Sequence, residues 1–379
     1  MDKLIVVEFT EAWTPGGVES YIVNIADSIN VDKFEVIIWA TQVYARLFDD
    51  DLKRLGKELY SPVSVESFPN PIKRTLNGMR IFKDTVKGLK CDVFHLHASN
   101  GIAWIYAYMA KKSGVKKIVF HAHSSYLGQK NRMIKLIVHN ICKNVFKDCV
   151  DVRLACSDKS ADFMYSKRDL RLDSVRFINC IIDIDRFRFN PEIRTALRRQ
   201  YEIADNEAVF IHVGRFQYEK NHTYLIDIFE ELTKSISSRL ILIGEGKILG
   251  SIKEKIAEKR LNDKVIIIEK TREVQNYLFM ADAFILPSLH EGNPIVTAEA
   301  QAAGLTCYIS ERVTKRAKLL DSTKYIGIED ASQAAKVIVD DYKNKEWEYD
   351  RVSCNDVVKQ RGYDKIKQIK VLEDIYEGE

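Results

Sequence analysis

Two glutamates, Glu291 and Glu299, lie eight residues apart in a segment with the features of a helix start. Pro294 suits a first helical turn and Gly304 can end the helix, so one acid would lie at its start and one inside. A helix start binds phosphate through free backbone N–H groups, and carboxylates accept hydrogen bonds from hydroxyl groups. The pattern therefore indicates a nucleotide sugar. An amphipathic helix with two solvated glutamates is the alternative that the spacing alone leaves open.

Two apolar runs end next to residues that could do this chemistry. The run at 284–290 stops just before Glu291, so the acid would lie at the carboxyl end of a parallel strand, where open α/β sheets bind ligands. The run at 209–213 is followed by a glycine and two cations, Gly214, Arg215 and Lys220. A glycine permits close backbone approach, and two fixed cations can balance a diphosphate.

Two glycine pairs also follow apolar runs. Gly16 and Gly17 lead directly into a helical pattern, so their amides could face a ligand, although Gly-Gly after a strand is usually only a turn. Gly244 and Gly246 form a lone Gly-x-Gly, which is weak support for dinucleotide binding because the third glycine of that fingerprint is missing.

The order of these motifs resembles the retaining glycosyltransferases of family four, which have the GT-B fold. In the C-terminal half the similarity rests on Gly214-Arg215 with Lys220-Asn221, on Ile241–Gly246, on Leu286–Gly292 and on Glu299–Gly304. In the N-terminal half it rests on Gly16–Glu19, Ala155–Ser157 and Asn179–Asp183, as in bacterial capsule and exopolysaccharide members. The resemblance covers nearly the whole chain.

Alternating strand and helix patterns predict an α/β protein with two parallel sheets. The expected strands are residues 4–9, 34–40, 92–96, 117–121, 151–155 and 175–179, then 208–213, 239–243, 264–268, 283–286, 306–309 and 324–328. The resemblance implies two doubly wound, Rossmann-like domains facing across a cleft. Residues 1–185 would form the acceptor-binding domain and 186–355 the nucleotide-sugar-binding domain, with the helix at 356–379 crossing back to the first.

The resemblance also implies roles for individual residues. Arg215 and Lys220 would neutralise the departing diphosphate in place of a metal, so no metal or other cofactor is expected. Glu291 would hold donor-sugar hydroxyls, Glu299 the ribose diol, and His123 would orient the sugar or the acceptor. The expected catalytic residues are His123, Arg215, Lys220 and Glu291. The expected donor-binding residues are Gly16, Gly17, Gly214, Arg215, Lys220, Arg272, Glu291, Gly292, Asn293, Pro294, Ile295 and Glu299.

Two patterns could instead hold a metal ion. Two His-x-His pairs, His95 with His97 and His121 with His123, end neighbouring strands with side chains on one face, as a zinc hydrolase would require. The resemblance assigns a role to His123 alone and makes the others hydrogen-bonded lining. Asp183-x-Asp185 has a metal-binding form, but in the resembling family it lies in the connection between the domains.

Composition and charge restrict the function classes. The chain has 379 residues, 46% of them hydrophobic, and a net charge of +4, which is too small to imply nucleic acid as a partner. Seven cysteines without a Cys-x-x-Cys pair indicate reduced thiols, and no run approaches the ~20 apolar residues of a membrane span. We expect a cytoplasmic protein.

Two basic amphipathic segments, 72–90 and 128–147, are typical of helices that rest on anionic lipid. We expect their apolar stripes to pack in the core. Their basic faces, which include Lys83, Lys87, Lys130 and Lys135, are either solvated or in contact with the inner face of the plasma membrane.

The motifs and the resemblance together favour a retaining, metal-independent hexosyltransferase. It would move a sugar from a nucleoside diphosphate donor, such as a UDP-sugar, to a polyprenyl-linked or growing glycan in capsule or exopolysaccharide assembly. Two alternatives remain: a sugar-nucleotide 2-epimerase of the same fold, and a non-catalytic partner subunit. Arg316 departs from the pattern of the resembling family, in which many members have Glu at this position.

Overall fold

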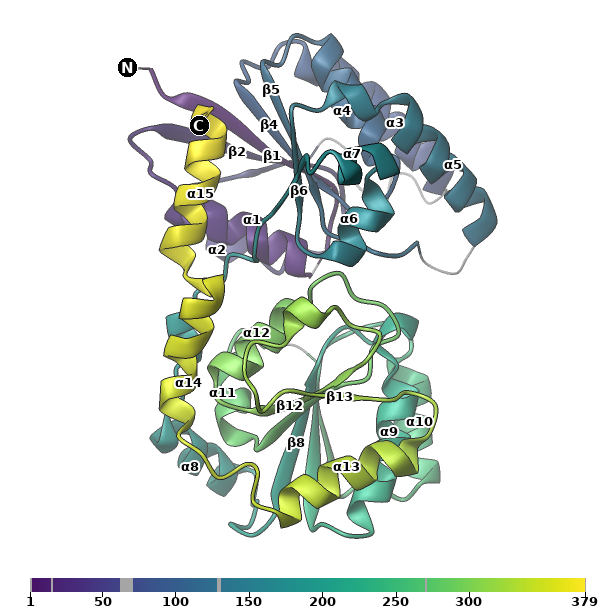
Figure 1. Cartoon of the computed structure of the whole chain (residues 1–379), viewed down its shortest axis with the longest axis vertical. Coiled ribbons are helices and arrows are strands. Elements are labelled where there is room, and N and C mark those ends of the chain that lie inside the picture. The colour runs from purple at the N-terminus through teal and green to yellow at the C-terminus, as the bar shows by residue number, and fades with distance from the viewer. Residues whose placement is uncertain (1, 15, 62–70, 128–130, 270, 379) are drawn as a thin grey trace. The chain divides into compact units, whose positions relative to one another are not determined.

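A computed structural model describes residues 2–14, 16–61, 71–127, 131–269 and 271–378 of the chain. The chain divides into two compact units (Figure 1). Unit 1 contains Met1–Ile182 and Lys365–Glu379, and unit 2 contains Asp183–Asp364. Each unit is described by itself below.

In the described part of unit 1, seven parallel strands form one sheet in the order β3-β2-β1-β4-β5-β6-β7. The strands are β1 (Leu4–Trp13), β2 (Phe34–Val43), β3 (Leu59–Tyr60), β4 (Val93–Ala98), β5 (Lys117–Ala122), β6 (Val152–Ala155) and β7 (Val175–Phe177). The helices are α1 (Gly17–Ser28), α2 (Asp49–Arg54), α3 (Pro71–Val86), α4 (Ala103–Lys112), α5 (Arg132–Val145), α6 (Asp158–Met164), α7 (Lys167–Arg171) and α15 (Lys365–Glu377).

In the described part of unit 2, six parallel strands form a sheet in the order β10-β9-β8-β11-β12-β13. They are β8 (Ala208–Val213), β9 (Ser238–Ile243), β10 (Val265–Ile268), β11 (Ala283–Leu286), β12 (Thr306–Ser310) and β13 (Lys324–Ile326). The helices are α8 (Pro191–Gln200), α9 (His222–Thr233), α10 (Leu249–Glu258), α11 (Val274–Met280), α12 (Ile295–Ala302), α13 (Ala331–Lys343) and α14 (Arg351–Val358).

In each sheet, successive strands are added first toward one edge and then toward the other, starting again from the middle of the sheet. This change in the order of strands defines a doubly wound fold. The reversal lies between β1 and β4 in unit 1 and between β8 and β11 in unit 2. The predicted fold class is therefore confirmed. The sequence missed β3, whose two residues are too few to produce a period, and it ended β1 and β2 early, because polar side chains interrupt the apolar run beyond Phe9 and Ala40.

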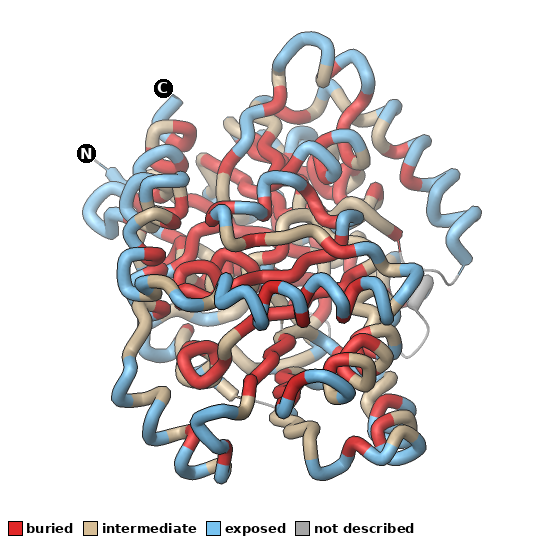
Figure 2. Tube along the Cα trace, turned by 60° about the horizontal axis from the view of Figure 1, so that its bottom comes forward, coloured by how far each residue is buried: buried red, intermediate tan, exposed pale blue. Residues whose placement is uncertain are grey.

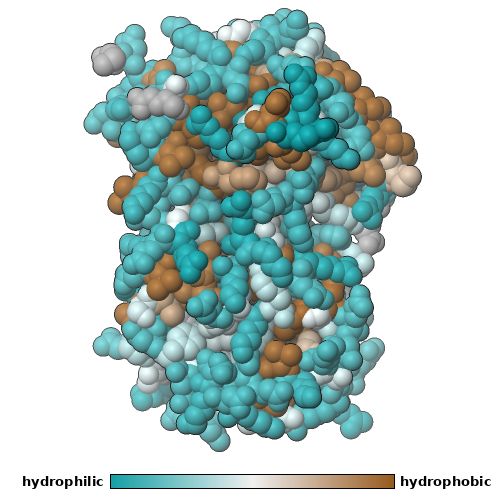
Figure 3. Space-filling model, in the orientation of Figure 1, coloured by the Kyte–Doolittle hydropathy of each residue, from teal (hydrophilic) through white to brown (hydrophobic). Residues whose placement is uncertain are grey.

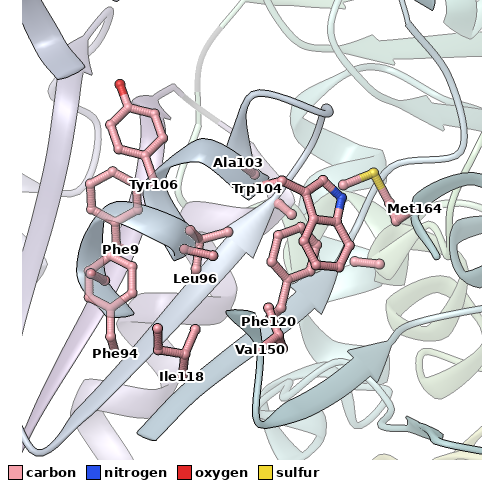
Figure 4. Packing of buried hydrophobic residues seen from close by; sticks show 14 of the residues in the cluster. Phe9, Phe94, Leu96, Ala103, Trp104, Tyr106, Ile118, Phe120, Val150 and Met164 are labelled. Atoms are coloured by element: carbon pink, nitrogen blue, oxygen red, sulfur yellow. The ribbon is translucent and has the colours of Figure 1, made fainter. Parts of the chain in front are cut away.

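Strands and the inward faces of helices together form the core of each unit, and Figure 2 colours the buried residues red. In unit 1 the core contains several aromatic rings among its aliphatic residues (Figure 4). The rings of Trp104 and Phe120 stack with centroids 4.0 Å apart, and Phe9 contacts Phe94 at 5.1 Å. Such ring pairs stabilise a core beyond the area that they bury.

The last helix, α15, returns to unit 1. Tyr376 donates a hydrogen bond of 2.8 Å from its hydroxyl to Glu8 in β1. Lys117 at the start of β5 donates to the carbonyl of Ile375, and the backbone N–H of Asn30 donates to Glu373. The end of the chain therefore completes the unit that the start of the chain builds.

The two basic amphipathic segments pack differently from each other. In α3 the stripe is core as expected, because Phe82 and Val86 are at most 1% exposed. In α5 the expectation that the stripe is core is wrong. Only His139 and Cys142 of α5 are buried, and the Nε2–H group of His139 donates to the carbonyl of Phe163 at 2.8 Å. The apolar residues of α5 face outward, exposed by 38–72%: Met133, Ile134, Leu136, Ile137, Val138, Ile141 and Val145.

Candidate functional site

The β8–α9 turn of unit 2 carries the predicted cations. A Cβ at Gly214 would lie 3.2 Å from both the His212 ring and the stem of Lys220, so a side chain there would force these neighbours to shift. Arg215 is exposed, while Phe216 is buried and anchors the turn. Gly214 therefore lets the Lys220 side chain cross the carboxyl end of β8.

The Gly244–Gly246 turn supports this loop rather than forming a dinucleotide fingerprint. Both glycines have positive φ, 147° and 157°. A Cβ on Gly244 would lie 2.2 Å from the carbonyl oxygen of Gly214, and one on Gly246 would lie 2.3 Å from that of Phe216. Two backbones pack against each other here, which only glycine permits.

The loops after β8 and β11 are joined by hydrogen bonds. The backbone N–H of Leu289 donates to the carbonyl of Glu219 at 2.8 Å, and the Asn221 amide donates to that of Pro287 at 3.2 Å. Since β8 and β11 flank the point where the strand order reverses, the joined loops lie where doubly wound sheets bind ligands.

Lys220 and Glu291 meet directly across these loops. The Lys220 Nζ lies 2.5 Å from Glu291 Oε1, and the two side chains are 20% and 13% exposed. The structure therefore brings together Lys220, which is predicted to bind phosphate, and Glu291, which is predicted to bind the donor sugar. A diphosphate that drew Lys220 to itself would leave the Glu291 carboxylate available to accept from sugar hydroxyls.

The predicted helix after Glu291 is α12, with Pro294 as its N-cap and Ile295 as its first residue. Gly304 follows it with φ 69°, as the sequence predicted. Between Glu291 and the helix, Gly292 and Asn293 are half-buried, and the Asn293 amide donates to the Tyr363 hydroxyl at 3.0 Å. The sequence missed Tyr363, because 70 residues separate the two partners.

Glu299 lies inside α12, half-buried, and no described residue forms a hydrogen bond with its side-chain carboxyl group. Burial raises the pKa of Glu299 to about 7, although the positive charge of Arg186 opposes the shift. A carboxyl group that titrates near neutrality, with its acceptors unused, can accept from a diol when ionised.

Arg186, which the sequence also missed, links the region of Glu299 to the loop after β10. Its guanidinium donates to the carbonyl of Arg272 and to the side chain of Gln275. Arg272 itself, one of the expected donor-binding residues, is exposed. The resembling family makes its nucleobase contacts at positions 270–272, of which Lys270 lies outside the described residues.

The predicted residues of unit 1 are Gly16, Gly17 and His123. Gly16 is the N-cap of α1, and buried Glu19 holds the preceding turn by accepting from the backbone N–H and the hydroxyl of Thr14 at 2.8 and 2.9 Å. A Cβ on Gly16 would lie 3.0 Å from the Glu19 carboxylate. The loop between β1 and α1 is thus held by a charged hydrogen bond.

His123 directly follows β5 and is half-buried, whereas His95, His97 and His121 are at most 2% exposed. The four rings share one face of the sheet, and Tyr21 of α1 contacts three of them edge-on at 5.3–5.7 Å. His95 and His97 are hydrogen-bonded, as the resemblance implied for the lining histidines, but among the described residues neither ring nitrogen of His121 has a hydrogen-bond partner.

The residues of the two alternative metal sites, the histidine cluster and Asp185, contact other protein side chains. Ring nitrogens of His95, His97 and His121 lie within 4.8 Å of one another, but the first two already contact the Glu8 carboxylate at 3.0 and 2.7 Å. Asp185 forms ion pairs with Lys359 at 2.6 Å and with Arg188 at 3.7 Å. Phe187, two residues after Asp185, is buried.

Comparison with known families identifies the class of protein. Residues 15–186 match the model described as "Glycosyltransferase Family 4", and residues 193–349 match "Glycosyl transferases group 1". The chain belongs to these glycosyltransferases and has their GT-B fold.

Its relatives include bacterial polysaccharide enzymes. The chain is 26% identical to the putative glycosyltransferase EpsF of Bacillus subtilis, over 79% of this chain and 77% of the relative. It is 23% identical to the capsular polysaccharide biosynthesis glycosyltransferase CapH of Staphylococcus aureus, over 75% of each. The structure of Anabaena HepE in complex with UDP and glucose superposes with a TM-score of 0.79, at 14% identity, over 99% of this chain and 100% of that one.

Proposed function

We propose that this protein is a retaining, metal-independent hexosyltransferase that takes its sugar from UDP and adds it to a polyprenyl-linked or growing glycan in capsule or exopolysaccharide synthesis. The observation that carries the proposal is the pairing of Lys220 with Glu291 at the joined loops after β8 and β11. Relatives support the substrate classes: HepE was solved with UDP and glucose, and one Escherichia coli relative is named as a galactosyltransferase acting on GlcNAc-diphosphoundecaprenol.

The proposed mechanism divides the work among five side chains. Arg215 and Lys220 balance the charge that grows on the diphosphate as the glycosidic bond breaks. Glu291, released from Lys220, accepts from hydroxyls of the transferred sugar, and Glu299 accepts from the ribose diol. His123 orients the sugar or the acceptor. Because the two cations do the work of a metal ion, the reaction needs no divalent metal.

The test is to incubate the protein with a panel of UDP-hexoses and a polyprenyl-diphosphate sugar, and to follow the product by mass spectrometry. The anomeric configuration of the new linkage, read by NMR, decides between retention and inversion. A sugar-nucleotide 2-epimerase would release UDP and an altered sugar without any acceptor. A non-catalytic partner subunit would bind a donor saturably and turn over none.

We also propose that α5 rests on the inner face of the plasma membrane, where a polyprenyl-linked acceptor would lie. Its outward apolar residues form a patch that a space-filling view shows at the edge of unit 1 (Figure 3). Arg132, Lys135 and Lys143 accompany that patch, and α5 contains no acidic residue. An apolar stripe bordered by cations is complementary to anionic lipid. Lys130, expected to contribute, lies outside the described residues, and no described helix is long and apolar enough to cross a bilayer.

A further inference from the structure

Three side chains of unit 1 form a hydrogen-bonded series that ends at His123. The Glu8 carboxylate in β1 lies 2.7 Å from Nε2 of His97 in β4. The other ring nitrogen of His97, Nδ1, lies 3.0 Å from Nε2 of His123. Glu8 and His97 are buried, so neither can exchange these partners for water.

The series fixes the position of each proton. Burial alone would raise the pKa of Glu8, but attraction and hydrogen bonds from His95 and His97 hold it well below its usual range, so Glu8 is an ionised acceptor. His97 must therefore donate from Nε2. Burial lowers the pKa of His97 to about 4, so the ring is neutral and its Nδ1 carries a lone pair.

His123 must then donate from Nε2 to His97. Burial also lowers the pKa of His123 well below its usual value, so this ring too is neutral and its Nδ1 is an acceptor. No described residue forms a hydrogen bond with that nitrogen. His123 is also the one ring of the four that is not fully buried.

We infer, building on the proposed function, that Glu8 and His97 are positioning residues that hold His123 as the Nε2–H tautomer, so that its Nδ1 accepts a hydrogen bond from a hydroxyl of the sugar substrate. A carboxylate or phosphate group cannot donate to this nitrogen when ionised. The series thus selects a neutral, hydroxyl-bearing group at the point where the substrate reaches His123.

The first measurement needs neither substrate nor variant. Protein labelled with 15N-histidine is examined by long-range 1H–15N NMR at neutral pH, and the signals of His123 are assigned by their loss in His123→Gln. We expect one neutral tautomer with the proton on Nε2. A proton on Nδ1, an imidazolium, or an equal mixture of tautomers overturns the inference. This result stands even if the proposed activity fails.

Two matched variants test the role of Glu8. Glu8→Gln keeps the shape but introduces an amide that can donate to His97, so the single tautomer of His123 should be lost. Tyr376→Phe removes another hydrogen bond from the same carboxylate, 2.8 Å long, and leaves the series intact, so the tautomer should persist. An unchanged tautomer in Glu8→Gln, or one lost equally in Tyr376→Phe, contradicts the assignment.

Measurements of kcat/KM show whether Glu8 positions His123 for the substrate or only stabilises the fold. In folded Glu8→Gln we expect kcat/KM for the sugar donor to fall at least about tenfold, as when a hydrogen bond to a charged group is lost. In Tyr376→Phe it should change by less than about threefold. A changed tautomer with unaltered kcat/KM in Glu8→Gln would show that Nδ1 of His123 does not meet the substrate.

Discussion

Lys220 makes a short ion pair with Glu291 and is proposed to move to the diphosphate when the donor binds. Since charge on the diphosphate grows as the glycosidic bond breaks, Lys220→Ala should lower kcat by roughly 10²–10³, the range for losing one transition-state donor. Initial rates at saturating donor and acceptor measure the effect. Lys336→Ala, on the exposed side of α13, is the matched control and should keep full activity. Full turnover in Lys220→Ala would contradict the proposal that Lys220 balances the charge on the diphosphate.

Glu299 should make donor affinity depend on pH. Its carboxyl group has a pKa of about 7 in the fold, and only its ionised form offers all its lone pairs to the ribose diol. The donor KM should therefore fall as pH rises from 6 to 8 (a range about one unit either side of that pKa), with kcat nearly unchanged. Glu299→Gln should have a higher KM that does not vary over this range. A wild-type KM equal at both pH values would argue against a ribose contact.

The same shift has a consequence for stability. The pKa of Glu299 rises from 4.5 to about 7 on folding, so the folded chain holds the proton more tightly than the unfolded chain. The resulting stability is fully present below pH 4.5 and is lost as pH rises through 7. Glu299→Gln avoids this loss, so its melting temperature relative to wild type should increase between pH 5 and 8, a window about these two pKa values. A constant difference would contradict the shift.

At the scale of elements, two nearby glycines should respond oppositely to alanine. Gly246→Ala places a Cβ 2.3 Å from the Phe216 carbonyl at a φ of 157°, and should cost about 1–3 kcal/mol. Gly250 in α10 has open space around it, so Gly250→Ala should stabilise unit 2 by up to about 1 kcal/mol. Denaturant unfolding measures both. Equal effects would mean that the close approach of the Gly244–Gly246 turn to the backbone at Phe216 does not constrain the loop after β8.

The outward face of α5 should govern membrane binding. Replacing Ile137 and Ile141 with Ser removes two residues that are 56% and 55% exposed, and should abolish most sedimentation with anionic vesicles. The control replaces Ile366 and Val371 of α15, which are 81% and 44% exposed, and should bind like wild type. High salt should also weaken binding, since each lysine near an anionic surface contributes about 1 kcal/mol. Equal sedimentation of both double variants would exclude α5 as the contact.

Over the whole molecule, the sequence predicted what local pattern and motif order determine. The strands, the two sheets and the helix after Glu291 followed from apolar runs and from Pro294 and Gly304. Contacts between distant segments were not predictable, because neither Arg186 near Glu299 nor Tyr363 at Asn293 has a local pattern. The prediction that the apolar stripe of α5 packs in the core was wrong for a related reason. Periodicity identifies an apolar face of a helix, but it does not show whether the sheet or another surface covers that face.

The metal requirement tests the two units together, because unit 2 offers cations to the diphosphate while unit 1 holds a buried histidine group. If Arg215 and Lys220 balance the leaving group, turnover should survive excess EDTA and should not rise with magnesium or manganese. His95, His97 and His121 are near enough to one another to hold an ion, so metal content should be measured on the same EDTA-treated sample by elemental analysis. Retained activity in metal-free protein supports catalysis by the two cations. Activity lost on chelation and restored by a divalent metal would instead require an ion in the reaction, and the roles given to Arg215 and Lys220 would be wrong.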